Sequence, residues 1–109
     1  MSRRDAIKVN VQGDSARAEL AGDFYMAATF TVETALEQAL EEPGVSALTL
    51  DLSGLRFIDS TGVGVLSRLE EQARSRGVAL SIVPGPREVQ RVFELAGLSE
   101  ILPFNPPPD

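Results

Sequence analysis

The segment VSALTLDLSGLRFIDSTGVGVL, residues 45–66, predicts a strand that leads directly into a helix. Five of its first eight residues are apolar and nearly continuous, which is typical of a central strand covered on both faces. A turn begins at Ser53, and apolar residues then continue as far as Asp59. A helix is predicted from about Thr61 to Arg76, because apolar residues recur at helical spacing and Gly77 follows. A strand that passes into a helix in this way favours an α/β fold.

The other segments extend this pattern into a single small domain. The expected elements are strands at 7–12, 16–22, 45–52 and 78–83 and helices at 31–41, 61–76 and 86–96, in the order β-β-α-β-α-β-α. The first two strands form an antiparallel hairpin, the later crossovers give parallel neighbours, and residues 101–104 could add a short terminal strand. We therefore expect one α/β domain across residues 1–109, with a small mixed sheet of four to five strands packed with helices. Its ordered core covers about 5–104, and residues 105–109 are a loose proline-rich tail.

Composition excludes several classes of function. The chain has 109 residues and a formal net charge of −6, with no cysteine and no histidine. Within this chain there can be no disulfide, no Cys/His zinc site and no Ser–His–Asp triad. The acidic balance argues against binding to a nucleic-acid backbone, and no apolar run is long enough to span a membrane. No secretory signal is recognisable, so we expect a cytoplasmic protein.

The segment GDFYMAAT, residues 22–29, is unusually apolar for a loop. Because large apolar side chains are mostly buried, we predict that Phe24, Tyr25 and Met26 pack into the core where the chain enters the first helix. The alternative is that these side chains form an exposed contact surface.

The residues between the central strand and its helix, 59–64, admit three interpretations. The simplest is structural: Ser60 or Thr61 caps the helix, Asp59 and Ser60 satisfy its unpaired N–H groups, and the glycines allow strand and helix to pack closely. A second is phosphate binding as in a dinucleotide fold, although GVGVLS matches the G-x-G-x-x-G fingerprint only in part. The third is that Ser60 accepts a phosphate, which adds about −1.5 to −2 charges. The partial positive charge at a helix start tolerates the phosphate, so the fold need not change. The added charge would instead affect the binding of a partner.

A strong resemblance to the STAS domain, and in particular to bacterial anti-sigma factor antagonists, is carried by residues 48–83, LTLDLSGLRFIDSTGVGVLSRLEEQARSRGVALSIV. Its specific element is the D-S-[ST]-G motif, here Asp59, Ser60, Thr61 and Gly62. The resemblance extends over nearly the whole chain. It includes the N-terminal hairpin and the ending VQRVFELAGLSEILPF, residues 89–104.

The resemblance implies a protein that switches partners and is not an enzyme. In this family an anti-sigma factor that is also a serine kinase, with a histidine-kinase-like ATPase fold, phosphorylates the serine of the motif. The unphosphorylated antagonist binds this kinase and releases a sigma factor, phosphorylation abolishes binding, and a serine phosphatase restores it. By position the acceptor is Ser60, with no catalytic, cofactor or metal site in the chain. The contact residues expected on this basis are Asp59, Ser60, Thr61, Gly62, Val63, Gly64, Asp23 and Tyr25.

The chain departs from the family pattern at one place. Family members commonly carry G-E-L-D where this chain has GDFY, so that Tyr25 replaces the second acid. In the family this loop lies beside the phosphorylated serine, and a more aromatic surface favours a different cognate partner. Two other functions remain open. One is a non-switching STAS scaffold or accessory subunit, in a signalling complex or a lipid transporter; the other is a nucleotide-binding module.

Overall fold

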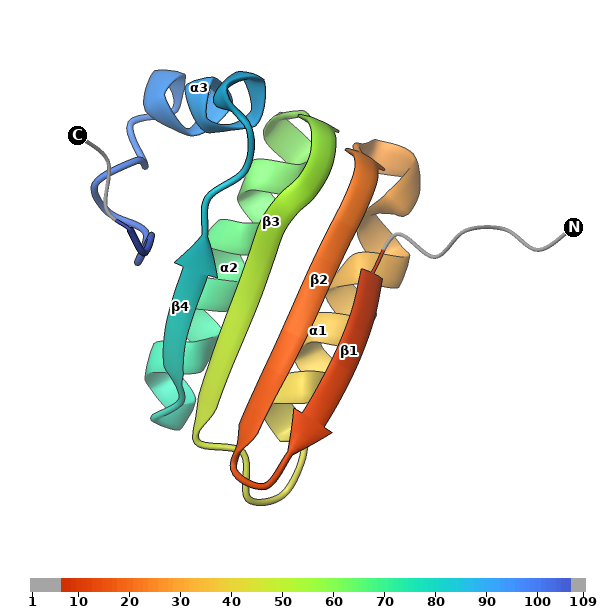
Figure 1. The fold of residues 1–109 in the computed structure, drawn as a ribbon, viewed down its shortest axis with the longest axis vertical. Coiled ribbons are helices and arrows are strands. Elements are labelled where there is room, and N and C mark those ends of the chain that lie inside the picture. The colour runs from red at the N-terminus through yellow and green to blue at the C-terminus, as the bar shows by residue number, and fades with distance from the viewer. Residues whose placement is uncertain (1–6, 107–109) are drawn as a thin grey trace, which may run out of the picture.

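The computed structural model describes residues 7–106, which form a four-stranded sheet and three α-helices (Figure 1). The elements are β1 (Ile7–Gln12), β2 (Ser15–Phe24), the 3-10 helix η1 (Met26–Ala28), α1 (Thr29–Glu41), β3 (Ala47–Ile58), α2 (Ser60–Arg76), β4 (Ala79–Val83) and α3 (Arg87–Leu95). The predicted fold class and element order are confirmed. Residues 1–6, and 107–109 of the predicted tail, lie outside the described residues.

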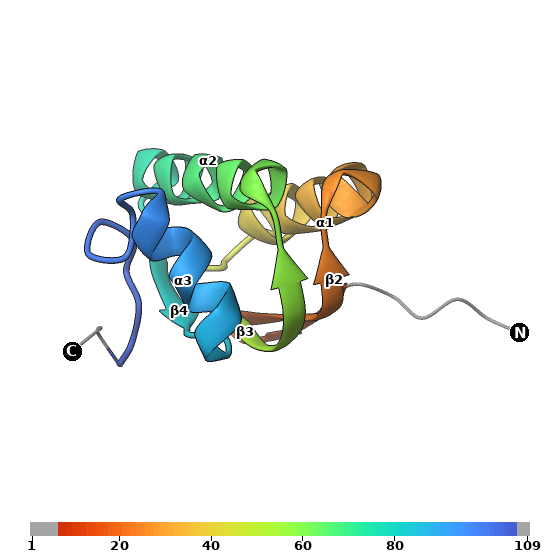
Figure 2. The same ribbon diagram turned by 90° about the horizontal axis from the view of Figure 1, so that it is seen from above.

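The sheet is mixed and has its helices mainly on one side. β1 pairs antiparallel with β2, whereas β3 pairs in parallel with both β2 and β4. Figure 2 shows α1 and α2 side by side over the same face. Along the first half of β3, Leu48 and Leu50 are fully buried, whereas Thr49 and Asp51 on the opposite face are only partly buried. The expectation that this strand is covered on both faces is therefore wrong.

β3 continues through the turn expected at Ser53 and ends only at Ile58. Its pairing with β2 shifts register near Gly54, where a Cβ atom would lie 3.0 Å from the Leu20 carbonyl oxygen. Glycine at this irregularity allows the two backbones to approach closely. Beyond it the pairing resumes, and Phe24 lies opposite Ile58. The end of β2 is thereby brought to the start of α2, which carries the sequence motif.

The C-terminal segment completes the core beside β4. The buried ring of Phe93, on α3, packs edge-on against Phe104 with the ring centroids 5.2 Å apart. Within the described residues, 101–104 do not form the short terminal strand considered above, and Phe104 makes an isolated bridge to Ile82 instead. Among the helices that the structure describes, none is long and apolar enough to cross a membrane.

Candidate functional site

Ser60 is the first residue of α2 and is exposed, whereas Asp59 occupies the N-cap position. The Gly62 N–H donates a hydrogen bond of 3.0 Å to Oδ1 of Asp59. The prediction that Asp59 satisfies an unpaired N–H group of this helix is therefore confirmed, whereas the prediction that Ser60 or Thr61 is the cap is wrong. Asp59 has an extended backbone, with φ of −112°, and this conformation turns its carboxylate toward the unpaired N–H groups of the first helical turn. The hydroxyl of Ser60 is consequently not needed for the cap.

Tight packing joins the end of β2 to the start of α2. The Asp59 N–H donates to the Phe24 carbonyl oxygen at 3.2 Å, and the Phe24 ring is buried. A Cβ atom at Gly62 would lie 2.8 Å from Cγ1 of Ile58 and 3.1 Å from the same carbonyl oxygen, so that a larger residue does not fit. Because Asp23 and Tyr25 flank Phe24, this packing holds both of them close to the motif.

The loop after β2 presents apolar side chains to solvent. Phe24 is buried as predicted, but Tyr25 and Met26 are 45% and 70% exposed, so the prediction for these two is wrong. The Tyr25 ring meets Phe57 edge-on with centroids 6.4 Å apart, and Phe57 is itself half exposed. We call Tyr25 and Phe57 the aromatic pair. Phe30, at the start of α1, is also exposed.

Phe57 and Phe30 are surface residues that sequence reasoning missed. Phe57 immediately precedes the buried Ile58 in β3, and neighbouring residues of a strand point to opposite faces. Strand alternation was therefore a signal that could have placed Phe57 outside. No comparable signal was available for Phe30, because the predicted helix began after it.

Ion pairs neutralise part of the charge around the motif. Asp23 pairs with Arg56 at 3.3 Å, and both side chains are largely exposed. On the other side, Arg68 of α2 pairs with Glu33 of α1 at 3.1 Å. Such surface pairs add little stability. They do balance the charges of Asp23 and Glu33 near the motif.

Six of the eight predicted contact residues are at least partly accessible. Exposed residues are Asp23, Tyr25 and Ser60, and partly buried residues are Asp59, Thr61 and Gly64. The remaining two, Gly62 and Val63, are buried. These two residues hold the motif against the core and offer a partner little surface of their own.

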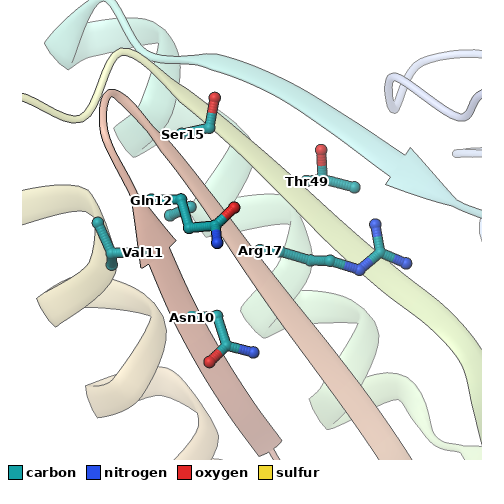
Figure 3. Close-up of a pocket in the computed structure, with 7 residues that line it drawn as sticks. Asn10, Val11, Gln12, Ser15, Arg17 and Thr49 are labelled. Carbon is teal, nitrogen blue, oxygen red and sulfur yellow. The ribbon is translucent and has the colours of Figure 1, made fainter.

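The described residues contain no group of three or more His, Cys, Asp or Glu side chains arranged to hold a metal ion. A hollow of about 450 Å³ lies over the open side of the sheet near the β1–β2 hairpin, at the opposite end of β3 from Ser60 (Figure 3). The residues that line it are Asn10, Val11, Gln12, Ser15, Ala16, Arg17 and Thr49. This hollow does not coincide with the G-x-G-x-x-S segment considered for phosphate binding.

The cation at this hollow is already paired. Arg17 forms ion pairs with Glu19 and Asp51. Burial raises the pKa of the Asp51 carboxyl, but hydrogen bonds from Ser53 and the charge and hydrogen bond of Arg17 outweigh burial, so that the pKa is lowered. Asp51 therefore stays ionised, and Arg17 has little unbalanced charge to offer an anionic ligand.

The sequence matches a family model and is similar to a protein of known role. The family model described as Mlab, STAS domain matches residues 7–103. RsfA, an anti-sigma-F factor antagonist of Mycobacterium tuberculosis, is 36% identical over 59 residues, which are 54% of this chain and 46% of RsfA. The match therefore spans about half the length of each protein.

Solved structures of similar fold include several anti-sigma factor antagonists. An anti-sigma factor antagonist from Mycobacterium paratuberculosis has a TM-score of 0.80 at 23% identity, covering 95% of this chain and 89% of that one. SpoIIAA in its unphosphorylated form has a TM-score of 0.74 at 20% identity, covering 85% and 82%. The phosphorylated form of the Bacillus protein has a TM-score of 0.68 at 19% identity, covering 85% of each chain. At these identities the likeness is one of fold.

Proposed function

Because this chain belongs to the STAS domain family, we propose that it is an anti-sigma factor antagonist that switches partners through Ser60. In its unphosphorylated form it binds an anti-sigma factor kinase with a histidine-kinase-like ATPase fold, and a sigma factor is released. Phosphorylation of Ser60 abolishes this binding, and a serine phosphatase restores it. The observation that supports the proposal best is the accessibility of Ser60 at the start of α2, in a cap that Asp59 completes.

A phosphate on Ser60 would act on the partner more than on the fold. The start of α2 carries partial positive charge, which favours an anion there. The Asp59 cap does not use the Ser60 hydroxyl, so its hydrogen bond to Gly62 would survive modification. A docked partner would instead meet new negative charge that it cannot solvate, and a single unpaired charge in an interface costs several kcal/mol. SpoIIAA, which has a similar fold, is known in both unphosphorylated and phosphorylated forms.

The chemistry of the switch belongs to the partners. A phosphoryl-transfer enzyme needs bound nucleotide, metal ions and a group that orients the nucleophile. In this proposal the kinase supplies these and Ser60 supplies only the accepting hydroxyl. The chain would then act without a cofactor, as a single regulatory domain in the cytoplasm.

The experiment that tests the proposal combines the chain with each anti-sigma factor kinase encoded in the same genome. We expect calorimetry to detect a complex in the absence of ATP. With ATP and Mg²⁺, mass spectrometry should find one phosphate on the peptide that contains Ser60, and the complex should dissociate. The Ser60→Ala variant is the control, because it should bind and remain bound in the presence of ATP. Binding that persists after complete phosphorylation of Ser60 would contradict the switch.

The aromatic pair is expected to contribute to partner affinity. Exposed tyrosines at an interface centre are frequent hot spots, with truncation costing about 2 kcal/mol, or roughly thirtyfold in affinity. We therefore expect Tyr25→Ala to raise the Kd for the kinase by at least about tenfold, measured by calorimetry. Leu95→Ala, which truncates an exposed apolar residue of α3, is the matched control and should leave the Kd unchanged. Equal Kd values for the Tyr25→Ala variant and the unchanged protein would exclude Tyr25 from the interface.

The same aromatic pair supports a second candidate function. Two half-exposed rings, of which Tyr25 stands in place of the family's second acid, suit a permanent apolar contact, as in a non-switching STAS scaffold or an accessory subunit of a larger assembly. In that case the chain would copurify with its partner from cells, and mass spectrometry would find Ser60 unmodified under all growth conditions. Recovery of phosphorylated Ser60 from cells would exclude this candidate.

A further inference from the structure

Three residues lie on one stripe of α2 that begins at the motif. Ser60, Gly64 and Arg68 are four residues apart, so that each is one helical turn from the next. Nη1 of Arg68 lies 3.7 Å from the point where a Cβ atom of Gly64 would be. The guanidinium group is therefore folded back over Gly64, toward the start of the helix, as helical side chains generally lean.

Glu33 orients this guanidinium from the neighbouring helix. Its Oε2 accepts a hydrogen bond of 3.1 Å from Nε of Arg68. The contact engages the inner nitrogen of the guanidinium, while Nη1 is the atom turned toward Gly64. A guanidinium group presents five N–H donors in a planar fork, so one arginine can contact a carboxylate and a phosphate at once. Glu33 thus helps to hold the guanidinium group over Gly64, one helical turn from Ser60.

We propose that Arg68 is the intramolecular partner of phosphorylated Ser60, and that it draws the phosphate over Gly64. This inference rests on the proposed function, because it takes Ser60 as the site of modification. It assigns to Arg68 a positioning role that is separate from kinase recognition. The residue contributes no chemistry to phosphoryl transfer.

The distances permit the contact without a change of fold. Residues one turn apart on a helix have their Cβ atoms about 5–6 Å from each other. Nη1 of Arg68 already lies over Gly64, which is one turn from Ser60. Gly64 is needed on this path, since a side chain there would stand between the phosphate and the guanidinium. The acids that face or neighbour this stripe and could compete for Arg68 are Glu33, Asp59 and Glu71. Of these three, Glu33 is the one paired with Arg68 in this structure.

The contact would explain how the phosphate excludes a partner. Gly64 is one of the accessible motif residues, and its lack of a side chain allows another chain to approach the backbone closely. A phosphate held over Gly64 covers this surface and also places charge on it. A phosphate that rotated freely at Ser60 would leave the surface open for part of the time. Arg68 therefore couples the modification to loss of the binding surface.

The test uses protein with phosphoserine inserted at position 60 during translation, so that no kinase is required. The quantity measured is the second pKa of the phosphate, from a ³¹P NMR titration. A guanidinium group nearby stabilises the dianion, and we expect the phosphate pKa of the Arg68→Gln variant to be about 0.3–0.7 units higher than that of the otherwise unchanged phosphoprotein. Arg74→Gln is the matched control. Arg74 is an exposed arginine of α2 that lies fourteen residues after Ser60 and pairs with Glu70.

A second measurement reports on Arg68 directly. The Nε–Hε signal of Arg68 in a ¹⁵N–¹H correlation spectrum should shift between the unmodified and phosphorylated proteins, and the signal of Arg74 should not. If the phosphate pKa is the same in the Arg68→Gln and Arg74→Gln variants and the Arg68 signal does not move, the proposal is wrong. That result would leave the proposed function intact. Conversely, if the kinase does not phosphorylate Ser60, the proposed function is wrong, but the inserted phosphoserine still tests the contact between the phosphate and Arg68.

Discussion

Replacing Ser60 with aspartate is expected to raise the Kd for the anti-sigma factor by about a hundredfold or more, because an unpaired interfacial charge costs several kcal/mol and each tenfold takes about 1.4 kcal/mol. Ser60→Ala should bind as tightly as the unchanged protein, since the hydroxyl is not needed for the helix cap. The new carboxylate would stand beside Asp59, on the exposed start of α2. Calorimetry with the three proteins and the same partner measures the effect.

The loss of binding in Ser60→Asp should not come from loss of the fold. A negative charge in the first turn of a helix is favourable by about 0.3–1 kcal/mol, although repulsion from Asp59 offsets part of this. We therefore expect the thermal unfolding midpoint to stay within a few degrees of the unchanged protein. Ser75→Asp adds the same charge to an exposed position in the last turn of α2 and serves as the control. If both variants weaken binding equally, the effect is one of net charge and Ser60 is not the switch.

Most of the fold was accessible from the sequence because its periodic signals are local. Alternation in β1 and helical spacing in α2 each identified an element and its type. The prediction that both faces of β3 are covered was wrong, because a nearly continuous apolar run does not show on which side of the sheet the helices lie. The strands follow one another in order across the sheet, β2-β3-β4. Right-handed crossovers that advance in one direction put α1 and α2 on the same face, so the topology decides what the apolar run could not.

The candidate site was located correctly in outline and mistaken in detail. The sequence placed a polar motif after the central strand, but the choice of Asp59 over Ser60 as the cap depends on a single extended backbone conformation. The prediction that Tyr25 and Met26 lie in the core rests on their size and apolar character, and the predicted strand 16–22 ends two residues before β2 does. β2 continues to Phe24, which keeps the inward phase of Ala16, Ala18 and Leu20. Alternation then turns Tyr25 outward.

Substitution of Gly62 by valine is expected to lower the free energy of unfolding by about 3 kcal/mol, which is typical of strong overpacking and corresponds to roughly 10–15 °C in the unfolding midpoint. The new Cβ atom would lie 2.8 Å from Ile58, whose side chain is itself buried, and 3.1 Å from the backbone oxygen of Phe24. Backbone cannot move away as the end of a flexible side chain can. Relief of the clash would separate α2 from β2 and break the contact that holds Tyr25 beside the motif. Thermal and urea unfolding followed by circular dichroism measure the loss.

Gly64→Val is the control that separates this clash from the general effect of replacing a helical glycine. Both glycines lie in the first turns of α2, so the gain in helix propensity is similar for the two variants. At Gly64 the Cβ atom would meet only Arg68, at 3.7 Å, which is ordinary contact with a movable side chain. We therefore expect Gly64→Val to change stability by no more than about 0.5 kcal/mol. Equal destabilisation by the two substitutions would mean that the close approach at Gly62 does not join β2 to α2. In that case Asp23 and Tyr25 would have to be held near Ser60 by the Asp59–Phe24 backbone hydrogen bond alone.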